Sequence, residues 1–207
     1  MTAENAGIEQ APRRNARGEA RKAHIIDAAL RVVGTRGISG VTHRAVASEA
    51  TITPGLVTYY FPTLDPLLEA TLRSYVDADM ERVAAAIEAL EHSGPRADRG
   101  AVLGAVFQAV AVEPAQQVAQ FELYLESVRR PGLRAVARDC LNGYANLARI
   151  ALERLGSTRA EEGSRALLAL FDGIALQRIV DDTEGYLEQV AIPAVLTLVE
   201  AYAPEGD

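Results

Sequence analysis

The sequence is poor in metal-binding and disulfide-forming residues, and it has no long apolar run. Cys140 is the single cysteine in 207 residues, so neither an intrachain disulfide nor a cysteine-based zinc cluster can form. The histidines His24, His43 and His92 are far apart and share no metal-ligand spacing. No apolar run approaches the roughly 18 residues that span a bilayer, and the N-terminus lacks the apolar core of a signal peptide. We therefore expect a cytoplasmic protein without a cofactor, a metal or a membrane contact.

The sequence also lacks the motifs of common enzymes. It contains neither a glycine-rich phosphate loop nor a nucleophile elbow. Cys140 falls in an apolar helical stripe, a pattern typical of a core residue. The acidic residues Asp181, Asp182 and Glu184 cluster where a helix is expected to end, and a solvated loop accounts for them. These features predict that the chain is not an enzyme.

The charges of the chain are unevenly distributed, although the net charge is -7. Between Arg13 and Phe61, eight basic residues stand against three acidic ones, so this segment carries +5 and the rest of the chain -12. A basic N-terminal part on an acidic remainder can approach phosphates in one orientation, because the acidic part is repelled. The N-terminal part is therefore a candidate nucleic-acid interface.

Apolar residues recur at spacings of three and four along almost the whole chain, and no segment shows the period of a strand. The pattern predicts an all-α fold of about nine helices. The first helix has an apolar face that includes Ile25, Ala29 and Val33, and Gly37 ends it. Residues 1–17 lack such a period and are expected to form a flexible basic arm, either a solvated tail or an arm that reaches a minor groove.

Capping residues and prolines mark the other helix ends. Asp65 is expected to cap a long helix, and residues 98–112 to form another. Residues 158–161 have the pattern of a capping box that opens the eighth helix. Pro193 lies inside the expected ninth helix, residues 184–202, and either kinks it or starts its second half.

Residues 42–61 have the pattern of a helix-turn-helix, in which two short helices cross closely over a tight turn. The positions with the small or apolar residue that this crossing requires are Val46, Ala47, Ala50, Ile52, Val57 and Tyr60. Thr42 and Thr53 precede the two helices, where each hydroxyl can accept from a free backbone N–H. The turn opens with Thr51, a β-branched residue that is either strained by a positive φ or has a negative one.

These residues resemble the tetracycline-repressor (TetR) family of regulators. The matching features are the face of the first helix, Thr42, Val46-Ala47, Ala50, Ile52-Thr53, Gly55 and the run Tyr59-Tyr60-Phe61 followed by Leu67-Leu68. The strong match covers residues 21–72, and the segments 129–131 and 172–177 extend it weakly. The chain departs from the family at Thr51, Thr58 and Leu64, where a glycine, a tyrosine and a basic residue are usual.

The resemblance implies a DNA-binding transcriptional regulator, a repressor that a small ligand releases from a palindromic operator. It places a helix-turn-helix domain at residues 18–62 and a ligand-binding and dimerisation domain at residues 63–207. The residues carried over as DNA contacts are Arg21, Thr42, His43, Arg44, Thr53, Pro54, Gly55, Leu56, Thr58, Tyr59 and Tyr60. Their hydroxyls suit phosphate oxygens, whereas His43 and Arg44 can donate to base edges.

Two further sets of residues are predicted in the C-terminal domain. The candidate lining of a mostly apolar ligand cavity is Phe107, Gln117, Gln120, Phe121, Tyr124, Tyr144, Asn146 and Phe171. The candidate interface of a four-helix dimer bundle is Ala166, Ala169, Gly173, Gln177, Val190, Ala194, Val195 and Leu198. Both sets can instead belong to the core of one chain. Asp172, an acid in an apolar helix, is expected to be paired at the interface or exposed.

The expected partners are double-stranded DNA, an unidentified small-molecule effector and a second copy of the chain. The alternative is a helical protein-binding adaptor without a DNA or ligand response. A regulator would bind a palindrome near its own gene with a steep salt dependence, and an adaptor would not.

Overall fold

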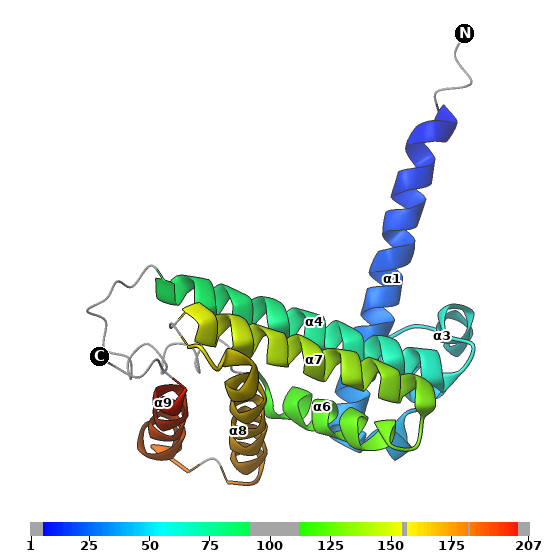
Figure 1. Ribbon diagram of the computed structural model, residues 1–207. Helices are drawn as coiled ribbons and strands as arrows, with labels where there is room; N and C mark the ends of the chain where they lie inside the picture. Colours follow the sequence, from blue (N-terminus) through cyan, green and yellow to red (C-terminus); the bar gives the residue numbers. More distant parts are fainter. Residues whose placement is uncertain (1–5, 92–111, 155–156, 182, 203–207) are drawn as a thin grey trace.

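The computed structural model describes residues 6–91, 112–154, 157–181 and 183–202, which are almost entirely helical and contain no strand (Figure 1). The α-helices are α1 (Ala6–Arg36), α2 (His43–Glu49), α3 (Pro54–Tyr60), α4 (Leu64–Glu91), α6 (Pro114–Ser127), α7 (Pro131–Arg154), α8 (Ala160–Val180) and α9 (Ile192–Ala201). Two shorter helical turns are η1 (Ile38–Gly40) and η2 (Leu187–Ala191). The all-α fold predicted from the apolar period is confirmed.

The first helix is longer than its apolar face predicts. It begins at Ala6, so residues 6–17 are helical where the sequence analysis expects an irregular arm. Six of these twelve residues are alanine or arginine, whose intrinsic helix propensity does not require an apolar face. Gly37 ends the helix as predicted, with φ +68° and its N–H bonded to the Val33 carbonyl oxygen at 2.9 Å.

The helix-turn-helix domain and the rest of the chain, called the body from here on, share one hydrophobic core. Ile25 and Val57 of the domain belong to the same buried cluster as Leu68 of α4, Leu123 of α6 and Leu133 of α7. In Figure 1, α4 and α7 lie side by side, and the N-terminal part of α1 extends away from them on the side opposite α6. The boundary predicted between residues 62 and 63 falls in the short link between α3 and α4. A shared core allows a change in the body to reach the helix-turn-helix through packed side chains.

The C-terminal helices form a second, smaller cluster, in which Leu167 and Ile174 of α8 are buried against Ala191 and Val195. The residues of η2 form one π-helical turn. Helix α9 starts directly after η2, with Pro193 in its first turn. Pro193 therefore starts the second half of the predicted ninth helix, because a first-turn N–H needs no intrahelical acceptor.

Two predicted caps are wrong, and one predicted helix lies largely outside the described ranges. Asp65 lies within the first turn of α4, which begins one residue earlier. Arg159 occupies the N-cap position of α8 without a side-chain capping bond, because a guanidinium has no acceptor, and it binds Glu162 at 2.7 Å. Residues 98–111 of the expected helix 98–112 are not described.

None of the helices in the described part of the chain combines the length and apolar character needed to cross a bilayer. The same residues contain no group of three or more His, Cys, Asp or Glu side chains that could hold a metal ion.

Candidate DNA-binding site

The two helices of the helix-turn-helix are held by buried apolar side chains. Val46 and Ala47 of α2, Ala50 of the turn and Val57 of α3 are buried, as predicted. Ala47 lies under the crossing, where a larger side chain would force the helices apart. The other two predicted positions, Ile52 and Tyr60, are half-buried against the same core, so four of the six are fully buried. This packing leaves the opposite face of α3 outward.

The turn between α2 and α3 is strained at Thr51. Its φ of 55° is the single positive value found at a non-glycine position in the described residues. A left-handed conformation costs a β-branched residue about 1–2 kcal/mol. The buried neighbours impose it, because the Ile52 N–H must reach the Ala47 carbonyl oxygen at 2.9 Å to close the turn. The strained alternative is thus the observed one.

The two expected threonine caps behave differently. The Thr42 hydroxyl accepts from the Ala45 N–H at 3.0 Å and caps α2 as predicted. Thr53 occupies the N-cap position of α3, but its side chain forms no capping bond, so this part of the prediction is wrong. Thr53 is exposed, so its hydroxyl lies at the surface beside the start of α3, where backbone N–H groups can receive an anion.

Three polar contacts hold the domain together, and the sequence analysis missed all of them. His24 of α1 donates to the Ala50 carbonyl oxygen at 2.8 Å, and Arg31 of α1 binds Glu49 of α2 at 2.8 Å. His43 donates from Nε2 to the Phe61 carbonyl oxygen at 2.7 Å and so ties the start of α2 to the end of α3. The partners are far apart in sequence, and no local pattern marks them.

The Nε2 atom of His43 is not placed for the base contact predicted for this residue. Its Nε2 is occupied inside the domain, so this nitrogen cannot donate to a base edge. We assign His43 to the positioning of α3. The neighbouring Arg44 is exposed and remains a candidate for contact with DNA.

Most of the other predicted contact residues lie at the surface. Tyr59 is 78% exposed, and its ring meets that of Tyr60 edge to face at 5.2 Å. Exposed positions are also found at Arg21, Thr42, Arg44, Thr53, Pro54, Gly55 and Thr58, and Leu56 is half-buried. The Thr58 hydroxyl donates to the Pro54 carbonyl oxygen at 3.1 Å, within the helix. Tyr60 packs partly against the core and is thus less available than Tyr59.

The predicted ligand residues of α6 and α7 make two separate sets of part-buried hydrogen bonds. Gln117 donates to Gln120 at 2.6 Å, and Gln120 donates to the Tyr124 hydroxyl at 3.4 Å. Tyr144 donates to the Asp79 carboxylate at 2.5 Å. Burial is the main cause that raises the pKa of Tyr124 and Tyr144 above the ordinary value, so both phenols keep their protons.

The remaining predicted lining residues have other environments. Asn146 is exposed and accepts from Arg149 at 2.9 Å, so its assignment to a cavity is wrong. Phe171 packs against the cluster of α8 and α9, which makes it a core residue of that cluster. Phe121 is half-buried, and Phe107 lies outside the described residues.

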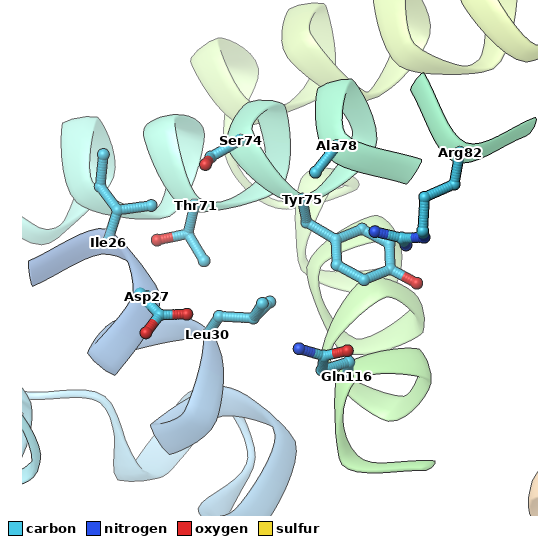
Figure 2. Close-up of a pocket in the computed structure, with 9 residues that line it drawn as sticks. All are labelled: Ile26, Asp27, Leu30, Thr71, Ser74, Tyr75, Ala78, Arg82 and Gln116. Atoms are coloured by element: carbon cyan, nitrogen blue, oxygen red, sulfur yellow. The ribbon is translucent and has the colours of Figure 1, made fainter. Parts of the chain in front are cut away.

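A small cavity with a volume of about 150 Å3 lies between α1, α4 and α6 (Figure 2). None of the predicted ligand residues lines it. Its walls include Ile26 of α1, Tyr75 and Arg82 of α4 and Gln116 of α6. These side chains come from three helices that are distant in sequence, so no single stripe could have indicated them.

The predicted dimer surface is only partly exposed. Gly173 has open space where a Cβ would lie, and Leu176, Val180 and Val190 are large apolar side chains at the surface. Val195 is 1% exposed because it packs within the chain, so its assignment to the interface is wrong. Leu198 also packs partly on this internal cluster, whereas Ala169 and Gln177 are exposed and Ala166 and Ala194 are half-buried.

Asp172 is not exposed, which was one of the two environments expected for it, and its pairing at a dimer interface stays a prediction. It is half-buried, and it forms no ion pair with another described residue. Burial raises the pKa of its carboxyl above the ordinary value.

Comparison with known families covers both parts of the chain. Residues 25–71 match the family model described as bacterial regulatory proteins, tetR family. Residues 94–203, more than half of the chain, match the model of the tetracyclin repressor-like C-terminal domain. The chain belongs to the TetR family. The TetR-family assignment makes it a DNA-binding transcriptional regulator, with α2 and α3 as its helix-turn-helix.

Curated and solved TetR-family relatives match over most of their length. The regulator BetI of Burkholderia thailandensis is 34% identical over 160 residues, which are 77% of this chain and 82% of that protein. The multidrug binding protein EbrR, solved in complex with imidazole, is 38% identical with a TM-score of 0.65, covering 90% of this chain and 97% of that one. A TetR-family member from Streptomyces coelicolor A3 is 40% identical with a TM-score of 0.67, covering 86% and 97%.

Proposed function

We propose that the protein is a homodimeric repressor that binds a palindromic operator in the cytoplasm and leaves it when a small molecule occupies the body. The observation that carries this proposal is the outward face of α3, which buried Val57 and the His43–Phe61 contact hold rigidly while Tyr59 stands 78% exposed. A seven-residue helix is unstable alone, so a rigid domain must present it to a groove.

The contacts with DNA divide by chemistry. Arg44, at the start of α2, is exposed and carries the fork of donors that suits a guanine edge. Tyr59 and Thr53, with the first N–H groups of α3, suit phosphate oxygens. Arg31 is excluded from this surface, because it is engaged by Asp27 and Glu49 within the domain.

The second copy docks on α8 and the segment around η2. Leu176, Val180 and Val190 place large apolar side chains at the surface there, and Gly173 leaves room for a close helix approach. Two linked helix-turn-helix domains gain affinity through effective concentration, which a single domain with few base contacts lacks.

The effector binds among the aromatic and polar side chains of α6 and α7. The solved relative EbrR was crystallised with ethidium, proflavin and malachite green. In this chain Tyr124 lies close to the carboxyl group of Asp172, which forms no ion pair with another described residue, whereas the Asp79 carboxylate beside Tyr144 is already paired with Arg82. Aromatic faces and carboxylates together suit a flat organic cation, and we assign that ligand class here. An effector that prefers the DNA-free spacing of the two domains would release the operator.

Footprinting of the purified full-length protein on the DNA around its own gene tests this function. We expect protection of a palindrome whose half-sites lie about one helical turn apart, and a steep loss of affinity with salt. Ethidium interferes by intercalating in DNA, so malachite green is the first effector to test. An adaptor would protect no site, and that result would end the proposal.

A further inference from the structure

The cavity between α1, α4 and α6 lies at the junction of the helix-turn-helix domain and the body (Figure 2). Its volume of about 150 Å3 is close to that of an engineered cavity that takes up benzene, but unlike that enclosed cavity it opens to solvent at the exposed residues Asp27, Ser74 and Ala78. Its lining combines the apolar Ile26, Leu30 and Ala78 with the polar Tyr75, Arg82 and Gln116. In the view of Figure 2 the three polar residues gather toward one end, with Ile26 toward the other.

The polar side chains of the cavity have unused hydrogen-bonding groups. Arg82 Nε is buried and has no hydrogen-bond partner among the described residues, although another nitrogen of the same side chain binds Asp79 at 2.7 Å. The Tyr75 hydroxyl and the Gln116 amide also make no hydrogen bond to a described side chain or backbone group. A buried donor without an acceptor is rare in folded proteins, so this end of the cavity is suited to a water molecule or a ligand.

The unused groups are mainly donors. Arg82 Nε–H can only donate, and Tyr75 keeps its proton because burial and Asp79 raise the pKa of the phenol. The Gln116 amide can both donate and accept. The charges nearby are compensated, since Arg82 is paired with Asp79 and Asp27 with Arg31. The site therefore calls for a neutral molecule with an acceptor oxygen, and gives little attraction to either sign of charge.

We propose that this cavity is a second small-molecule site that binds a neutral carbonyl compound of about benzene size. The carbonyl oxygen accepts from Arg82 and Tyr75, and the apolar part of the ligand lies against Ile26 and Leu30. The three-ring dyes found with EbrR are too large for this volume, so the site is distinct from the effector site of the proposed function. A ligand here contacts α1 and the body at once, which makes DNA affinity sensitive to its binding.

Titration of the isotope-labelled full-length protein with benzamide, followed by NMR, tests the proposal. We expect saturable shifts at residues of all three helices, and weaker binding by about tenfold for toluene, which has the same shape but no acceptor. Benzoate, which adds a charge, is also expected to bind more weakly. Equal binding of toluene and benzamide would overturn the proposal. No saturation with benzamide would also overturn it and leave a water-filled cavity.

Two variants separate the site from its surroundings. Ala78→Leu narrows the cavity and keeps every polar group, and Arg82→Met removes the donor; each should reduce benzamide affinity about tenfold. Arg149→Met, a surface change on α7, should leave it unchanged. An unchanged benzamide affinity in Ala78→Leu would place the ligand elsewhere and overturn the assignment. Operator binding without benzamide, measured on the same variants, reports separately on the proposed regulator function.

Discussion

Gly34 of α1 meets Ala115 of α6 so closely that a Cβ at Gly34 would lie 2.0 Å from the Ala115 carbonyl oxygen. Directly after α1, the N–H of Ile38 in η1 donates to the carboxylate of Glu122 in α6 at 3.2 Å. One contact is backbone packing and the other is a hydrogen bond, and both join α6 to the helix-turn-helix domain. Because α6 also carries part of the predicted ligand region, it is the most direct structural connection between that region and the domain.

Gly34→Ala should damage this connection. The added methyl group overlaps a backbone atom that cannot rotate away, so we expect a loss of about 1–3 kcal/mol in the free energy of unfolding. Gly18→Ala is the matched control in the same helix, because its Cβ would meet only the Tyr60 hydroxyl at 3.8 Å. The control should gain about 0.5–1 kcal/mol from helix propensity. Urea denaturation measures both, and equal effects would show that the close approach is not rigid.

His43→Ala should reduce folding stability, whereas Arg44→Ala should reduce the affinity for the operator. The first leaves the Phe61 carbonyl oxygen without its donor and should cost about 1–3 kcal/mol of folding stability. The second should leave the melting temperature unchanged and weaken operator binding by about 1–3 kcal/mol, with relaxed base preference at one position. Thermal unfolding and fluorescence anisotropy distinguish the two. If the His43→Ala protein is stable but has lost base preference, His43 contacts DNA as first predicted.

Val180→Asp should prevent dimer formation. Val180 is 81% exposed at the end of α8, and a carboxylate there would have to be desolvated in an apolar interface. Val128→Asp, at the C-cap position directly after α6, is the control, since Val128 is 66% exposed outside the proposed interface. Light scattering should show a monomer only for Val180→Asp, accompanied by loss of operator affinity. If both variants remain dimeric, the dimer interface does not lie on α8.

Acid should weaken the ion-pair network that joins Glu126 of α6 to Asp65 of α4 through Arg130, which lies between α6 and α7. The Arg130 and Arg129 guanidinium groups hold the pKa of the Glu126 carboxyl below its ordinary value, and Arg130 also binds Asp65 of α4. A carboxyl with a lower pKa in the folded state stabilises the fold above its unfolded pKa, and this stabilisation is lost as the pH falls through the folded value.

Urea denaturation from neutral pH down to about pH 3 should therefore show a smaller acid loss in Glu126→Gln than in the unchanged protein. Glu153→Gln is the control, because Glu153 forms an exposed ion pair with Arg149 that solvent screens. Identical profiles for Glu126→Gln and the unchanged protein would exclude this carboxyl from the acid response.

The sequence alone was sufficient for the all-α class, the end of α1 at Gly37 and the buried positions of the helix-turn-helix. These features follow from local rules, namely the apolar period, the φ freedom of glycine and the small side chain needed where helices cross. The residues of the α3 face were also predictable, because the same period that buries Val57 turns Tyr59 outward.

The tertiary structure decided the features that depend on distant partners. His43 bonds to a residue 18 positions away and His24 to one 26 positions away, which removes His43 Nε2 from the DNA surface and fixes the strained turn. Val195 is apolar whether it faces a second copy or its own chain, and only the packing of α8 on α9 shows that it lies inside. The cavity at the junction likewise exists because three helices meet there. The apolar period of one helix does not determine where its side chains lie relative to another helix.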